Sequence, residues 1–232
     1  MKSKTGCLIC GEELVYQTDY KTMECYYCKK TFQSNVSCIN NHFVCDHCHA
    51  QSGMDLIETY CLNSKSVNPA DMATEIMHSD KISMHGPEHH FLVPAVLISA
   101  YCNATGDDTR LEKLRIARKR AEKIPGGFCG THGNCGAGVG TGIFISIITK
   151  STPLSKEEWR LSNLITGRSL ISIANHGGPR CCKRDVYLAL EEAVRFVKEK
   201  FNVGLESSKI HCRFSKFNKE CLKEECLFFA GC

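Results

Sequence analysis

The sequence lacks several features that would assign it to a familiar class. No apolar stretch is long enough to span a bilayer, and the longest, around VGTGIFISIIT, is rich in glycine. The opening residues MKSKTGCLIC contain no apolar signal-peptide core, so we expect a cytoplasmic protein with no membrane partner. A net charge of +4 in 232 residues falls short of the bias expected of a dedicated nucleic-acid-binding protein.

Several catalytic motifs are also missing. The CxxxCxxC spacing of radical-SAM enzymes, the GxSxG nucleophile elbow and the Walker loop do not occur. The sequence has no internal repeat beyond a recurring CxxC and no low-complexity tract. These absences argue against the corresponding enzyme classes.

Cysteine is abundant instead, with 17 residues. In a secreted chain such a number would suggest a disulfide framework, but the number is odd and the chain is long for such scaffolds. Thiols stay reduced in the cytoplasm, where crowded cysteines more often bind metal or do chemistry. The hydrophobic content of 43% is enough for a packed core.

The pattern predicts an α+β protein in two parts. Residues 1–52 read as a small zinc-ribbon or treble-clef-like module, because they are rich in cysteine and carry the short strand-like runs ELVYQT and KKTFQS. Residues 53–232 read as a mainly α-helical domain with a cysteine-rich tail. The expected helices run from Asn68 to about His78, from Pro94 onward, from Asp107 through Ala121, from Gly136 to about Ile148, from Ser155 to Gly177 and from about Arg184 to Phe201.

Closely spaced cysteines predict two structural zinc ions in the first part. Two residues between cysteines form a tight turn that brings both sulfurs onto one ion, and two such turns complete a tetrahedral site. Rubredoxin-like iron is the alternative metal, and Cys61 or another histidine can replace His42. The spacing leaves open whether the sites follow one another or interleave as in a cross-brace. The candidate ligands are Cys7, Cys10, Cys25, Cys28, Cys38, His42, Cys45 and Cys48.

Three further constellations lie in the second part. MHGPEHHF formally matches the HxxEH pattern of inverted zinc proteases with His85, Glu88 and His89. Gly86-Pro87 lies within this pattern and resists helix formation, which argues against a protease. A histidine pair that faces substrate or metal and a polar helix entry with satisfied histidines remain equal alternatives.

The second constellation is the glycine-rich stretch GGFCGTHGNCGAGVGTG, with Cys129, His132 and Cys135. A dinucleotide-binding loop would need a hydrophobic strand directly before it, and none is present. Tight helix packing explains the glycines of the following helix equally well. It does not explain two cysteines and a histidine in the preceding loop.

The third constellation is NHGGPRCCKRD, in which Cys181 and Cys182 are adjacent and Arg180, Lys183 and Arg184 flank them. Three cations at the start of a helix predict lowered thiol pKa values and reactive or metal-ligating cysteines. A buried, inert cysteine pair is the alternative. We expect Cys129, Cys135 and the vicinal pair to share one site.

The tail and one helix offer further candidates. Tail cysteines so spaced can close a metal site or share a cluster with the core cysteines. The helix over residues 110–123 is strongly basic, which indicates a solvated face or, less favoured, a nucleic-acid or anionic-substrate contact. The tail cysteines are Cys212, Cys221, Cys226 and Cys232.

HGPEHHFLVPA, GGFCGTHGNCGAGVGTGIF and HGGPRCCKRD together resemble an uncharacterised prokaryotic cysteine-rich family, a domain of unknown function that is common in anaerobes. The resemblance covers nearly the whole chain and implies no established activity, substrate or catalytic residue. Over a few residues, the CGA sequence with its glycine-rich helix is also similar to iron–sulfur redox proteins.

Two hypotheses follow. In the first, the second part is an iron–sulfur or thiol enzyme for redox or sulfur-transfer chemistry, and in the second, the chain is a zinc-scaffolded binding or regulatory protein whose vicinal thiols sense redox state or metal. The partner, a small molecule or a protein, is not identified. Candidate catalytic residues are Cys129, Cys135, Cys181, Cys182, His85, His89, His132, His176 and Arg180; candidate cluster ligands are the same four cysteines with Cys212, Cys221 and Cys226.

Overall fold

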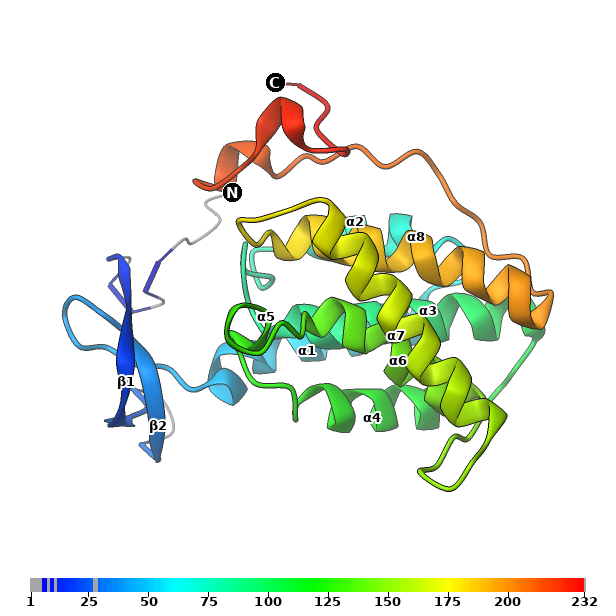
Figure 1. Ribbon diagram of the computed structural model, residues 1–232, viewed down its shortest axis with the longest axis horizontal. Helices are drawn as coiled ribbons and strands as arrows, with labels where there is room; N and C mark the ends of the chain where they lie inside the picture. Colours follow the sequence, from blue (N-terminus) through cyan, green and yellow to red (C-terminus); the bar gives the residue numbers. More distant parts are fainter. Residues whose placement is uncertain (1–5, 8, 11, 27–28, 232) are drawn as a thin grey trace.

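The structure is a computed structural model that describes residues 6–231 except 8, 11, 27 and 28, and only the backbone of residues 47 and 50–52. In this part of the chain, a two-stranded antiparallel sheet is followed by a bundle of α-helices, which confirms the predicted α+β class (Figure 1). The elements are β1 (Leu14–Glu24), β2 (Thr31–Cys38), α1 (Asp46–Asn63), α2 (Pro69–Met77), α3 (Glu88–Thr105), α4 (Arg110–Ala121), α5 (Phe128–Thr131), α6 (Gly136–Ile148), α7 (Glu157–Asn175) and α8 (Cys182–Phe201), with short 3-10 turns at Ser215–Phe217 and Lys223–Glu225.

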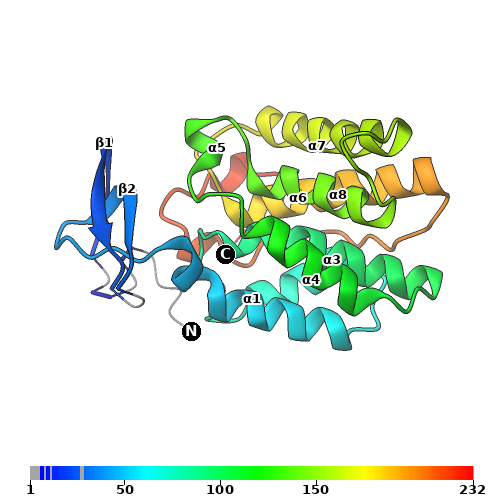
Figure 2. The same cartoon turned by 90° about the horizontal axis from the view of Figure 1, so that it is seen from below.

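Helix α1 belongs to both parts of the molecule. The β1–β2 hairpin lies beside the bundle, and α1 runs from it into the helical layers (Figure 2). Its N-cap is Cys45, a candidate metal ligand, whereas Ile57 and Cys61 near its end are fully buried in the core. The predicted division at residue 52 falls inside this helix.

Helix α3 forms the centre of the core and contacts α1, α2, α4, α6 and α8. It is apolar on all sides, as expected of a helix that is surrounded by others, and residues 91–98 are fully buried. The expectation that it begins after Pro94 was wrong, because Pro87 is its N-cap and Pro94 lies inside it. Packing on every side compensates for the hydrogen bond that an internal proline removes.

The glycines of α6 allow close approach to two neighbouring helices. A Cβ at Gly142 would overlap the Thr166 hydroxyl of α7, and one at Gly140 would lie 2.9 Å from the Pro94 Cδ of α3. Tight helix packing therefore explains this run. The predicted bounds of α6 are confirmed, and the segment before it is the short helix α5.

Helix starts differ in how well local sequence predicts them. The Asn68 cap is confirmed, because its side chain accepts hydrogen bonds from the Ala70 and Asp71 N–H groups. The Ser155 capping box was wrong, because Ser155 Oγ accepts from the Thr152 N–H and Lys156 is the N-cap of α7. Helix α8 begins at Cys182, two residues before its expected start.

The C-terminal segment returns along the bundle to the start of α8 (Figure 1). It leaves α8 at Asn202, and its Phe214 and Phe228 side chains are buried. The Phe228 ring meets the Tyr187 ring of α8 edge-on at 5.3 Å, and the Cys212 N–H donates to the Phe228 carbonyl at 2.7 Å. The tail is thereby fixed against the first turns of α8.

Among the residues that the structure describes, no helix combines the length and apolar character that crossing a bilayer requires.

We expect Gly142→Ala to destabilise the protein, because its Cβ would overlap Thr166 and lie 3.1 Å from the Ser162 carbonyl oxygen. The cost should be about 1–3 kcal/mol, measured by chemical denaturation. Gly167→Ala on α7 is the matched control, since nothing lies within 4 Å of its added Cβ. The control should gain up to about 1 kcal/mol from helix propensity. Equal stability changes in the two variants would contradict this account.

Candidate functional site

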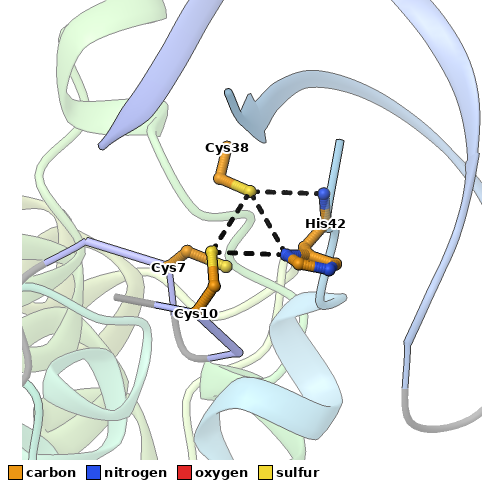
Figure 3. Close-up of side chains that lie close together, drawn as sticks. All are labelled: Cys7, Cys10, Cys38 and His42. Atoms are coloured by element: carbon orange, nitrogen blue, oxygen red, sulfur yellow. Dashed lines mark hydrogen bonds between the residues drawn. The ribbon is translucent and has the colours of Figure 1, made fainter. Parts of the chain in front are cut away.

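Cys7, Cys10, Cys38 and His42 converge on one point (Figure 3). Their ligand atoms all lie within 4.8 Å of one another. The Cys10 and Cys38 sulfurs are 3.8 Å apart, and His42 Nδ1 lies 3.3 Å from Cys10 Sγ and 3.5 Å from Cys38 Sγ. A tetrahedral ion with bonds of about 2.3 Å to sulfur and 2.0 Å to nitrogen requires edges of about 3.8 and 3.5 Å. The group can hold one metal ion, with His42 rather than the buried Cys61 as its fourth member.

A second group consists of Cys25, Cys45 and Cys48. Cys25 follows β1, Cys45 caps α1 and Cys48 lies in the first turn of that helix. The Cys45 N–H donates to Cys25 Sγ at 3.3 Å, which holds the strand end against the helix start. The fourth predicted ligand, Cys28, lies outside the described residues. Three thiols are therefore placed for a second ion.

The register of the hairpin explains why the two sites interleave. Leu14 at the start of β1 pairs with Cys38 at the end of β2, whereas Glu24 pairs with Thr31 at the other end. Ligands before β1 therefore meet ligands after β2, and Cys25 lies at the opposite end of the hairpin. The chain after His42 then crosses back, with the Tyr26 N–H bonded to the Phe43 carbonyl at 2.8 Å. The cross-brace, one of the two arrangements left open by the sequence, is the one present.

In the helical domain, four cysteines line one pocket at the start of α8. The cavity that these residues enclose has a volume of about 20 Å³ and opens to solvent. Apolar walls come from Met84, Phe214, Leu222 and Phe228, and Arg184, Asn218 and Glu220 are its polar neighbours. Among the described residues, no third group of ligand atoms comes within 4.8 Å of one another, so these sulfurs are not gathered as for a single ion. The four are Cys181, Cys212, Cys221 and Cys226.

Backbone N–H groups donate to the pocket sulfurs. Phe214 N donates to Cys212 Sγ and Lys223 N to Cys221 Sγ, each at 3.4 Å and from two residues further along the chain. The same turn occurs in the first metal group, where Ile9 N donates to Cys7 Sγ at 3.4 Å. Such bonds stabilise thiolate over thiol, which is the form that binds metal. The turns at Cys212 and Cys221 therefore have the same N–H to sulfur bond as the turn at Cys7 in the first metal group.

The expectation of lowered thiol pKa values in the vicinal pair was wrong for the metal-free chain. Burial raises the pKa of Cys181 to about 11, and burial also raises the pKa of Cys182, with the Asp185 charge adding to the effect. Arg180 and Arg184 oppose these shifts without reversing them. Desolvation disfavours the charged thiolate more than the nearby cations favour it.

Cys129, Cys135 and the vicinal pair do not close into one ligand group. Cys181 interacts electrostatically with Cys212, whereas Cys182 interacts with Cys135, and Cys135 with Cys129. Cys135 Sγ donates to Asp185 Oδ2 at 3.8 Å. Burial raises the pKa of Asp185 to about 6 and that of Cys135 to about 12. Cys129, Cys135, Cys181 and Cys182 therefore do not form one preformed metal site in the described residues. A catalytic or ligand role for each of them stays a prediction.

A buried polar cluster holds the starts of α3 and α8 together. Lys183 is 1% exposed and donates to the Ser83 carbonyl at 2.9 Å, while Glu88 Oε1 accepts from the Ser83 N–H at 2.8 Å. The Lys183 ammonium also lies 5.2 Å from the centre of the Phe214 ring. Burial lowers the pKa of Lys183 to about 8 and raises the pKa of Glu88. His49 of α1 reaches the Ser83 hydroxyl at 3.2 Å.

The predicted histidines lie in four different environments. His85 borders the cysteine pocket, 3.3 Å from Asn218 Oδ1 and 3.8 Å from Glu220 Oε2. His89 is buried, and its Nδ1 is 2.9 Å from the Gly86 carbonyl oxygen. His132 is exposed and stacks on Phe128, and His176 bonds the Ser172 carbonyl at the end of α7. His85 precedes α3 while Glu88 and His89 begin it, so the HxxEH residues do not share one helix.

Arg180 connects the hairpin to the thiols. Its guanidinium donates to the Tyr16 hydroxyl of β1 at 2.9 Å and interacts with Cys129 and Cys182. In the basic helix α4, Arg118 pairs with Asp55 at 2.6 Å and Glu58 at 2.7 Å on α1. These two arginines therefore have structural contacts that their sequence context did not indicate.

The sequence offered a cluster shared by core and tail cysteines as one alternative, and the structure places Cys181 with three tail cysteines in one pocket lining. The contact of Asp185 with Cys135 was missed, because it depends on where α6 packs against α8. The backbone N–H groups two residues after Cys212 and Cys221 donate to the sulfurs of these cysteines, and this arrangement exists only in the folded turns.

The matching family model covers residues 57–229 and is described as a family of unknown function, DUF5714. The chain belongs to this family. No curated protein and no solved structure matches significantly. The family therefore supplies no activity, and function must be inferred from the residues.

Two double substitutions, each of which removes two cysteines, test whether the two metal groups interleave. Cys7→Ser with Cys38→Ser removes two ligands of one group, so about one metal ion per chain should be lost. Cys7→Ser with Cys25→Ser damages both groups, so about two should be lost. Metal analysis of chelator-free protein gives the counts. Loss of one ion in the second variant and two in the first would mean sequential sites.

Proposed function

We propose that the protein is an iron–sulfur redox protein of a reducing, cytoplasmic environment whose N-terminal module is held by two zinc ions. The observation that carries the proposal is the pocket lined by Cys181, Cys212, Cys221 and Cys226. These thiols come from the start of α8 and from a tail that returns to it. The described cysteines of the helical domain are free thiols, as such an environment requires.

The pocket residues fit a four-iron cluster better than a single ion. Four cysteine thiolates are the usual ligand set, and cluster irons hold their thiolates further apart than one ion does. The pocket lining contains four cysteines, and no three of their sulfurs lie within 4.8 Å of one another. N–H donors to Cys212 and Cys221 would offset part of the anionic charge. A bound cluster would supply one-electron chemistry.

The neighbouring side chains have defined tasks in this proposal. Phe214 and Phe228 are buried apolar residues of the pocket lining, and the buried Lys183 and Arg184 would place two cations near an anionic cluster. Burial lowers the pKa of His85, and its Nε2 lies 3.3 Å from Oδ1 of Asn218, a residue of the pocket lining. Charge, burial and hydrogen bonds to sulfur are the protein's means of setting a cluster potential.

Zinc is the metal proposed for the two interleaved groups. Tetrahedral sites built from cysteine and histidine with four protein ligands are typical of structural zinc, and the measured edges around His42 agree with its bond lengths. A closed site leaves no position for substrate. The module therefore holds shape and positions Tyr16 and α1 against the bundle.

We expect Cys221→Ser to abolish the absorbance at about 400 nm that an iron–sulfur cluster gives anaerobically purified protein. Iron should fall from about four per chain while zinc is retained. Cys102→Ser is the matched control, because Cys102 is buried in α3 away from the pocket lining.

A colourless wild-type protein without iron would contradict the proposal. It would favour the zinc-scaffolded regulatory alternative, in which the same thiols sense redox state or metal.

A further inference from the structure

A second cavity lies against the C-terminal tail. It has a volume of about 300 Å³, opens to solvent, and is lined by residues of both 3-10 turns. The tail itself lies on the outside of the bundle, beside the start of α8 (Figure 1). The cavity is therefore a hollow in the surface of the molecule. Its lining residues are Ser215, Lys216, Lys223, Glu224, Phe229 and Gly231.

A single layer of chain separates this cavity from the four-cysteine pocket. Ser215 lines both, and of the neighbouring residues Phe228 and Phe229 the first lines the pocket and the second lines the cavity. Lys223 lines the cavity, while its N–H donates to the sulfur of Cys221, a pocket cysteine, at 3.4 Å. A cluster held by the pocket sulfurs would therefore lie one layer of chain beneath the surface of the cavity.

The segment around the cavity is more basic than acidic. Residues 209–225 contain five lysines or arginines and three glutamates. One of the glutamates, Glu220, lines the pocket rather than the cavity and lies 3.8 Å from His85 Nε2. All five cations are exposed, and none forms an ion pair within the described residues, so their charge is available to an acidic partner. They are Lys209, Arg213, Lys216, Lys219 and Lys223.

Apolar side chains belong to the same segment. Leu227 is 61% exposed, and Phe229 is a half-buried residue of the cavity lining. A small surface that combines exposed cations with a few apolar residues suits a transient electron-transfer partner, because such interfaces bury less than about 1,200 Å². It suits a nucleic-acid backbone less well, because three carboxylates lie among the five cations.

We propose that Lys216, Lys223, Leu227 and Phe229, together the tail surface, form the docking site of a small acidic one-electron carrier protein that reduces the cluster. This inference rests on the proposed function, because it names the partner of the cluster site. One electron passes from the reduced carrier to the oxidised cluster, the carrier is oxidised, no bond forms or breaks, and no proton moves. Opposite charges speed the encounter, and the small contact area lets the oxidised carrier leave.

The test uses the full chain, purified anaerobically with its cluster, and a small acidic [2Fe–2S] ferredoxin as the probe. Isothermal titration calorimetry of the two oxidised proteins should show binding at about 50 mM salt that weakens about tenfold at about 300 mM, because salt screens exposed charges. A basic cytochrome c of similar size is the control of opposite charge and should not bind. Electron paramagnetic resonance of rapidly frozen mixtures with reduced ferredoxin should show reduction of the cluster separately from oxidation of the carrier.

Two double substitutions with the same change of net charge separate the tail surface from the charge of the whole chain. Lys216→Glu with Lys223→Glu should weaken binding about tenfold and slow reduction of the cluster by a similar factor. Lys119→Glu with Lys123→Glu reverses two exposed cations in and after α4 and should do neither. Both variants should keep the absorbance at about 400 nm. Lys216→Glu with Lys219→Glu takes the place of the first variant if that one loses its cluster.

Brown wild-type protein that binds neither probe, or binds ferredoxin and cytochrome c equally, would overturn the docking site and leave the proposed function intact. The same holds if the two double variants bind ferredoxin equally well, or if binding weakens while reduction of the cluster keeps its rate. Colourless wild-type protein without iron would overturn the proposed function and this inference together.

Discussion

The buried ammonium group of Lys183 is the interaction on which the arrangement of the helical domain depends. A charge removed from water must be hydrogen-bonded or paired, and removing one partner of such a set costs about 3–5 kcal/mol. Lys183 meets this requirement through the Ser83 carbonyl, the nearby Glu88 carboxylate and the Phe214 ring. These groups come from the loop before α3, from α3 and from the tail, so one side chain fixes all three against α8. Cys181 and Cys182 directly precede Lys183 in the chain, so these contacts also hold the two cysteines at the start of α8.

The N-terminal module depends on a different constraint, the antiparallel register of β1 and β2. With Leu14 opposite Cys38, each metal group takes ligands from segments that the hairpin separates in sequence. Neither group can close until the hairpin has formed, and the hairpin exposes Tyr16 and Tyr20 to solvent and buries little apolar surface of its own. Metal binding by these groups would therefore require strand pairing, as expected of a module too small for a separate core.

Local signals in the sequence predicted the features that depend on local interactions. The Asn68 cap and the bounds of α6 belong to this class, as do the ligand candidates from Cys7 to Cys48 that the two metal groups contain. The start of α3 was missed because Pro94 is tolerated only through packing on every side, which no short window reports. The thiol pKa values of the vicinal pair were misjudged because Arg180 and Arg184 are visible in the sequence and burial is not. The partnership of Cys181 with the tail depends on a chain reversal after Asn202 that brings residue 212 back to the start of α8.

Helix α1 links the N-terminal module to the helical domain. Its N-cap and first turn supply Cys45 and Cys48 to the second metal group, while its last turns lie in the core, so a single hydrogen-bonded rod is common to both. Asp46 at its start accepts the Gly126 N–H at 2.8 Å, in the loop that leads to Cys129 and Cys135. A metal ion bound by the second group would fix the first turn of α1, and the Asp46 bond would then hold this loop in place. By reciprocity, order in the loop would favour metal binding.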